Sequence, residues 1–172
     1  MQKVTLCGVG AHHQNGVSEN TIKQVTLASR TMLLHAQRHW PEYISTMQWP
    51  FALLAAADRM NNLNVNLKGQ TPEMNFSSAP DLTTRLKDFH TFGCPVYILD
   101  SRLQSAGGPG PPKWEPCSRI GVYLGHSLFH AGSVALVFNP STGHVSPQYH
   151  VVFDDEFSTV PYMENGTIPQ HW

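Results

Sequence analysis

The feature that most constrains the fold of this chain is a change in the spacing of its apolar residues. Up to about residue 80, apolar side chains recur every three or four positions, which is the period of an amphipathic helix. From Phe89 onward they alternate in short runs separated by turn residues, which is the pattern of β-strands. The 172 residues therefore predict an α+β chain in which helices come first and a small β unit follows.

The change of pattern falls next to Ser77-Ser78-Ala79-Pro80, a run of small and turn-forming residues. We place the boundary between two units there. Residues 1–80 form the helical unit, residues 81–160 form the β unit, and residues 161–172 are expected to be a polar tail.

Helix boundaries in the first unit follow from capping and breaking residues. The first helix is expected to start at Val17, with Asn15 as its N-cap, and to end near His39. A second helix is expected to open at Pro41 and to be kinked or divided at Pro50, because proline disrupts a helix interior.

Local signals also mark a third helix and the strands. Thr71-Pro72-Glu73 combines a cap, a first-position proline and an acid in the first turn, which predicts a short helix. Strands are expected within 92–99, 119–125, 133–138 and 145–153, with a turn at residues 139–143. Several short strands so close together indicate a small antiparallel barrel or sandwich.

Composition excludes several classes of protein. Apolar residues make up 41% of the chain and charged residues only 13%, which does not suit a disordered, charge-rich chain. Three widely separated cysteines indicate neither a disulfide framework nor a CxxC zinc pattern, and we expect a reduced, intracellular protein. No apolar run approaches the ~18 residues of a membrane span.

The charge balance differs along the chain. The net charge of −1 gives no global indication of nucleic-acid binding. Residues 1–40, however, carry Lys3, Lys23, Arg30 and Arg38 against Glu19 alone. This end of the chain is suited to face an anion.

Glu19 is the first candidate for chemistry, because it falls in the first turn of the first predicted helix. An acid there complements the helix dipole without any catalytic role. It could also supply one oxygen ligand to Mg²⁺, but two-metal phosphoryl transfer needs further carboxylates. Before Asp58 the only other acid is Glu42, and Asp58 lies beside Arg59, which favours a pairing role. Both interpretations of Glu19 stay open.

Lys23 and Arg30 are seven residues apart, so they lie two turns apart on one polar face of the first helix. Gln14 and Asn15 add polar side chains just before it. Such a face is suited to contact a phosphate backbone, and it is equally typical of a solvated helix surface.

Several of these stretches together resemble the integrase of copia-type retrotransposons. His12-His13-Gln14-Asn15-Gly16-Val17-Ser18-Glu19 is similar to the motif that carries the third metal-binding acid of that family. Further similar stretches follow in the family's order: Trp49-Pro50-Phe51-Ala52, Phe92-Gly93-Cys94-Pro95-Val96-Tyr97, Arg119-Ile120-Gly121-Val122-Tyr123-Leu124-Gly125 and Val151-Val152-Phe153-Asp154-Asp155.

The resemblance implies the C-terminal, helical part of an RNase H-like catalytic core followed by an SH3-like β-barrel, within a Pol polyprotein. It implies Mg²⁺- or Mn²⁺-dependent joining of transposable-element DNA to target DNA, hence DNA integration in the nucleus. It implies Glu19 as a catalytic metal ligand, and Gln14, Asn15 and Lys23 as nucleic-acid-binding residues. The implied partners are DNA and further copies of the integrase.

The chain also departs from the family. The two other catalytic aspartates are carried by strands that this sequence lacks, and Asn20 stands where the family usually has arginine. We therefore expect a DNA-binding fragment that is not catalytic alone, and we keep a non-catalytic protein-interaction or oligomerisation module as the alternative. Without those strands, Val25, Met32 and Leu33 are expected to lack cover, and the helical unit to pack poorly by itself.

Overall fold

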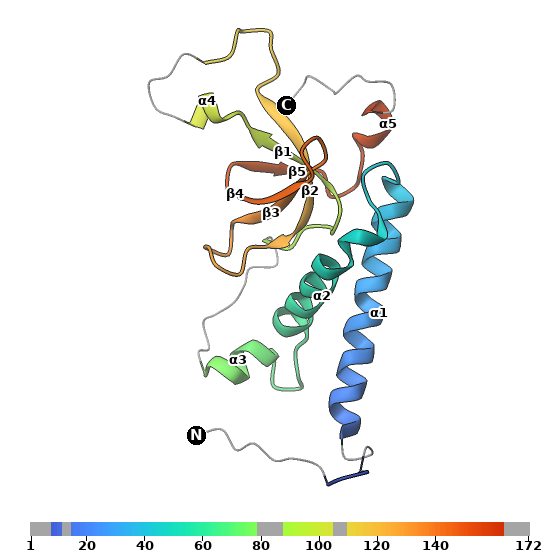
Figure 1. Cartoon of the computed structure of the whole chain (residues 1–172). Coiled ribbons are helices and arrows are strands. Elements are labelled where there is room, and N and C mark those ends of the chain that lie inside the picture. The colour runs from blue at the N-terminus through green and yellow to red at the C-terminus, as the bar shows by residue number, and fades with distance from the viewer. Residues whose placement is uncertain (1–7, 12–14, 79–87, 105–109, 164–172) are drawn as a thin grey trace.

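The computed structural model describes residues 8–11, 15–78, 88–104 and 110–163, and it places helices against one five-stranded antiparallel sheet (Figure 1). The helices are α1 (Gly16–His39), the 3₁₀ helix η2 (Thr46–Gln48), α2 (Trp49–Leu63), α3 (Pro72–Ser77), α4 (Ser101–Gln104) and α5 (Val160–Met163). The strands are β1 (Pro95–Leu99), β2 (Ser118–His126), β3 (Ala135–Asn139), β4 (His144–Gln148) and β5 (Val151–Phe153). The α+β prediction is confirmed at this level.

The first helix has the predicted bounds but not the predicted cap. Asn15 occupies the N-cap position with φ −97° and ψ 9°, and its side chain makes no capping hydrogen bond. A capping side chain needs an extended backbone to reach the free amides of the first turn, and Asn15 does not have one. At the other end, the Trp40 amide donates to the Ala36 carbonyl at 2.8 Å, just before Pro41.

The second helix begins later than predicted. Residues 41–45 form a turn and lead into η2, where Ser45 and Gln48 form a reciprocal capping box. Helix α2 then starts at Trp49, which places Pro50 in its first turn. Proline is tolerated there because its missing amide hydrogen would have no helical partner anyway. The expected division at Pro50 is therefore a helix start.

The short third helix agrees with its sequence signals. The Thr71 hydroxyl accepts a hydrogen bond from the Met74 amide at 3.2 Å, and Pro72 occupies the first turn. Ser78, with φ 56°, ends the helix in the left-handed region.

The sheet has the strand order β4-β3-β2-β1-β5, and all pairs are antiparallel. The predicted turn at residues 139–143 joins β3 to β4. The run 145–153, predicted as one strand, is two strands at opposite ends of the sheet. A bend at Tyr149 and His150 separates β4 from β5, and β5 pairs with β1 rather than β3. Alternation alone does not reveal such a bend, because both halves keep a strand-like pattern.

One apolar core joins the helices to the sheet. Its buried members include Leu33, Ala36, Trp40, Ile44, Ala52, Phe92, Cys94, Val96, Val122, Leu124 and Val137. Leu33 is only 8% exposed and Met32 packs against the core, so the expectation that these two side chains lack cover is wrong. Poor packing of the helical unit by itself stays a prediction.

The N-terminal half of α1 lies outside that core. Helix α2 runs beside the C-terminal half of α1, and the other half extends past it (Figure 1). Ile22 is accordingly 66% exposed, whereas Val25 is half-buried. Apolar side chains in the first turns of the helix, such as Ile22, therefore lack cover.

Asp154 organises the turn that follows β5. Its two carboxylate oxygens accept hydrogen bonds from the amides and hydroxyls of Ser158 and Thr159, at 2.6–3.0 Å. Burial by itself would raise the pKa of Asp154, but these hydrogen bonds outweigh it and lower the pKa. A lowered pKa in the folded state means that the ionised carboxylate stabilises the fold.

We predict that Asp154→Asn lowers the free energy of unfolding by about 2 kcal/mol at pH 7, because an NH₂ group would face the Thr159 donors. The contribution of Asp154 is present above the unfolded-state pKa of about 3.9 and is lost as pH falls through the lower folded-state pKa. Urea unfolding between pH 7 and pH 3 should show the difference from wild type shrinking at low pH. The exposed Glu42→Gln serves as control, and an equal effect there would contradict the prediction.

Candidate functional site

Helix α1 displays the predicted charged residues on its surface. Glu19, Lys23 and Arg30 are all exposed, and their spacing places them within about 40° of one another around the helix axis. Asn15 precedes them and is also exposed. Gln14 lies outside the described residues. The structure thus brings three of the predicted site residues onto one face.

Glu19 does not gather other metal ligands around it. Within the described residues, no three His, Cys, Asp or Glu side chains come together in a way that could hold a metal ion. A two-metal site for phosphoryl transfer needs several carboxylates around its ions. The described residues therefore do not fit the Mg²⁺ or Mn²⁺ site that the sequence resemblance implies. In the first turn of α1, Glu19 complements the helix dipole.

The basic side chains of α1 are available to a partner. Lys23, Arg30 and Arg38 are exposed, and none forms an ion pair with an acid among the described residues. Lys23 and Arg30 are separated by about 10 Å along the axis. Two cations that are held on one helix and form no ion pair within the described residues are suited to contact anions.

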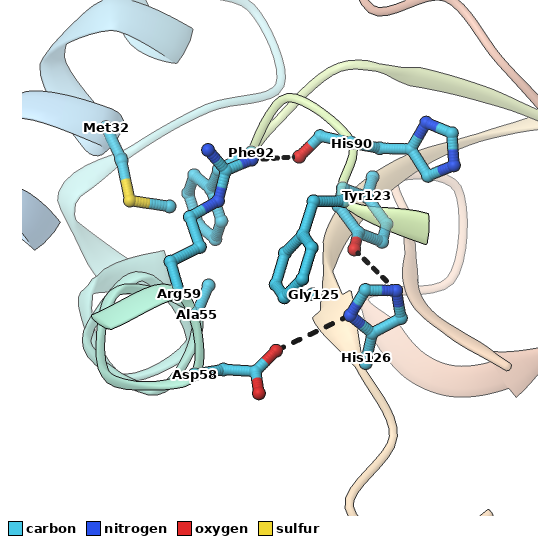
Figure 2. A pocket seen from close by; sticks show the side chains of 10 residues that line it. Met32, Ala55, Asp58, Arg59, His90, Phe92, Tyr123, Gly125 and His126 are labelled. Carbon is cyan, nitrogen blue, oxygen red and sulfur yellow. Dashed lines mark hydrogen bonds and ion pairs between the residues drawn. The ribbon is translucent and has the colours of Figure 1, made fainter. Parts of the chain in front are cut away.

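A second cluster of polar side chains lies between α2 and β2, and sequence analysis did not find it. Figure 2 shows two linked contacts: Asp58 lies 3.5 Å from His126 Nδ1, and His126 Nε2 lies 3.4 Å from the Tyr123 hydroxyl. Arg59 instead donates to the backbone carbonyl of His90. The pairing expected for Asp58 is thus made with His126, and adjacency to Arg59 in sequence was misleading.

This cluster resembles a catalytic arrangement, but the cavity on its Tyr123 side is too small for a substrate. The cavity beside it measures about 10 Å³, which is enough for one water molecule at most. Burial raises the pKa of the Tyr123 phenol, so that group stays protonated at neutral pH. The cluster therefore ties α2 to the sheet.

A larger groove lies next to it, with a volume of about 320 Å³. Its lining is mostly apolar and comes from α2, β2, β3 and the β2–β3 loop: Phe51, Leu54, Leu124, Leu128, Phe129 and Leu136. Asp58, His126 and Ser127 provide its polar groups. Such a lining is typical of sites that bind apolar groups. In the sequence, the signal that pointed to this groove was the apolar pair Leu128 and Phe129 inside a loop.

The described cysteines offer no nucleophile. Cys94 is buried, and its burial, followed by the charges of Asp155 and Asp154, raises the pKa of its thiol. A thiol that resists ionisation is unreactive. Cys117 is exposed, its thiol donates to the Glu115 carbonyl at 3.7 Å, and among the described residues no hydrogen bond joins it to a histidine or a carboxylate.

Comparison with known proteins adds no relative. No protein-family model, no curated protein and no solved structure matches this chain. Within the part of the chain that the structure describes, no helix combines the length and the apolar character needed to cross a membrane.

Proposed function

We propose that this chain is a DNA-binding, non-catalytic portion of a copia-type retrotransposon integrase. The observation that carries the proposal is the exposed basic face of α1, which follows directly on the stretch that resembles the integrase motif. The side chains of a site, rather than the fold, decide function.

The electrostatics of α1 support contact with a phosphate backbone. Lys23 and Arg30 are exposed, lie two turns apart on one face of α1, and form no ion pair with an acid among the described residues. Binding through such residues releases counterions and depends on salt, but it carries little sequence information. The proposed role is therefore to hold DNA in place.

The arrangement of elements is compatible with the architecture of that family. The sheet order β4-β3-β2-β1-β5 has four consecutive strands in a meander, and the fifth returns to pair with the first. SH3-like barrels have this strand order. We propose that β1–β5 form such a domain and that α1 and α2 derive from the C-terminal part of an RNase H-like core.

We also propose that the chain does not catalyse strand transfer by itself. Glu19 is exposed and stands apart from other described metal-binding side chains. A strand-transfer assay with Mn²⁺, element-end DNA and the purified chain should yield no joined product. Robust joining would contradict the proposal.

DNA binding is tested through the two cations of α1. We predict that Lys23→Ala/Arg30→Ala weakens binding to duplex DNA for all sequences and reduces the slope of log K against log salt concentration by about 2. Fluorescence anisotropy between 50 and 200 mM salt, a range chosen for its large expected change in affinity, measures this slope.

The matched control is Lys68→Ala/Arg119→Ala, which removes the same charge from exposed positions outside α1. An equal loss of slope in both double variants would mean that binding follows net charge and not the α1 face. Retention of the full slope in Lys23→Ala/Arg30→Ala would exclude α1 as the contact.

A second candidate function is a protein-interaction or oligomerisation module. It is favoured by the groove between α2 and β2–β3, beside which Leu128 is 69% exposed and Phe129 is 93% exposed. Apolar surface of this kind marks sites of association. The same anisotropy experiment separates the two functions, since a complete lack of salt-dependent DNA binding would favour this one.

A further inference from the structure

Two histidines occupy successive turns near the C-terminal end of α1. His35 and His39 are four residues apart, so their side chains lie on the same helix face, and their ring centroids are 4.6 Å apart. Both side chains are exposed. They are turned about 140° to 180° around the helix axis from Arg30, so they lie on a different side of α1 from the surface proposed to bind DNA.

Phe157 holds the two imidazole rings in place. Its ring stacks on His39 with a centroid distance of 5.0 Å and an interplanar angle of 23°. The same ring meets His35 edge-on at 5.8 Å and 70°. Phe157 is itself buried, so the histidine rings rest on a fixed part of the core. Side chains ordered in this way lose less entropy when they bind a ligand.

The separation of the rings matches that of two imidazoles on one transition-metal ion. With metal–nitrogen distances of about 2.0–2.1 Å, each ring centroid lies about 3.2 Å from the ion. For nitrogen–metal–nitrogen angles between about 90° and 109°, the centroids are then roughly 4.5–5.2 Å apart. The observed 4.6 Å falls in this interval.

The electrostatic surroundings also favour a bound cation. The pair lies at the C-terminal end of α1, where the helix dipole stabilises positive charge.

We propose that His35 and His39 form a two-histidine binding site for a borderline divalent transition-metal ion, of the class Zn²⁺, Ni²⁺ or Cu²⁺. Imidazole ligands select this class, whereas Mg²⁺ prefers oxygen ligands. No third His, Cys, Asp or Glu joins the pair among the described residues, so water completes the coordination. Two histidines at this helical spacing are a recurrent metal-binding arrangement.

The proposal is tested by calorimetric titration of the tag-free chain with Ni²⁺ and with Zn²⁺. We expect binding of one ion, weakened about 10-fold to 100-fold by His35→Gln or His39→Gln, because each variant removes one arm of a chelate. There are two controls. His144→Gln removes an exposed histidine outside α1, and His12→Gln/His13→Gln removes two histidines that are adjacent in sequence. Mg²⁺ should not compete.

Thermal unfolding gives an independent readout. The chelating spacing exists only while α1 is helical, so Ni²⁺ should raise the melting temperature of wild type and not of His35→Gln/His39→Gln. Unchanged affinity and an unchanged melting shift in the double variant would overturn the proposal. Loss of binding only in His12→Gln/His13→Gln would overturn it too, by moving the site to that pair.

Discussion

Gly93→Ala should lower the free energy of unfolding by about 2–5 kcal/mol, although it adds a single methyl group. Gly93 has φ +79°, and a Cβ built there would overlap the side chain of Ala36 and lie 3.4 Å from Ile44. Ala36 is fully buried on α1, so neither it nor the sheet can move aside easily. Left-handed backbone costs a non-glycine residue about 1–2 kcal/mol, and overpacking adds about 1–3 kcal/mol.

The matched control separates strain from overlap. Gly143 also has positive φ, +72°, but no atom lies within 4 Å of a Cβ built there. Urea unfolding should show Gly143→Ala to be mildly destabilised and Gly93→Ala to be destabilised more strongly, by the added cost of the overlap. Addition of Ala36→Gly to Gly93→Ala should restore part of the stability, because it removes the overlapping methyl group. Equal effects at Gly93 and Gly143 would contradict the close approach.

The second large effect is expected at Trp40, where the chain leaves α1. Its side chain is 1% exposed and packs edge-on against Tyr43, with ring centroids 5.0 Å apart. Trp40→Ala should lower the free energy of unfolding by about 3–5 kcal/mol, because it leaves a cavity between the helices and the sheet. Denaturant unfolding followed by circular dichroism measures the loss.

Two further variants test the cause. The indole nitrogen of Trp40 has no hydrogen-bond partner among the described residues, so Trp40→Phe removes a buried polar group while keeping most of the apolar volume. It should cost far less than Trp40→Ala. Trp49→Ala should change stability by about 0.5 kcal/mol or less, since Trp49 is 59% exposed. A large cost at Trp49 would mean that tryptophan content, and not position, decides the effect.

The candidate site was only partly predictable. Placing Lys23 and Arg30 on one helix face needed only the helical period, and α1 confirms it. The groove was not predictable, because Phe51 on α2 and Leu136 on β3 meet only after folding. The contact of Asp58 with His126 likewise joins residues from different units, whereas sequence adjacency favoured Arg59.

Local sequence signals were sufficient for the secondary structure: the helix from Gly16 to His39, the Thr71 cap, the β3–β4 turn and the general order of helices and strands. These follow from capping, proline and side-chain period, which act over a few residues. The separation of β4 from β5, the burial of Leu33 and the close approach of Gly93 to Ala36 became apparent only in the folded chain. Such outcomes depend on contacts between distant residues, and no local pattern specifies which apolar faces will cover one another.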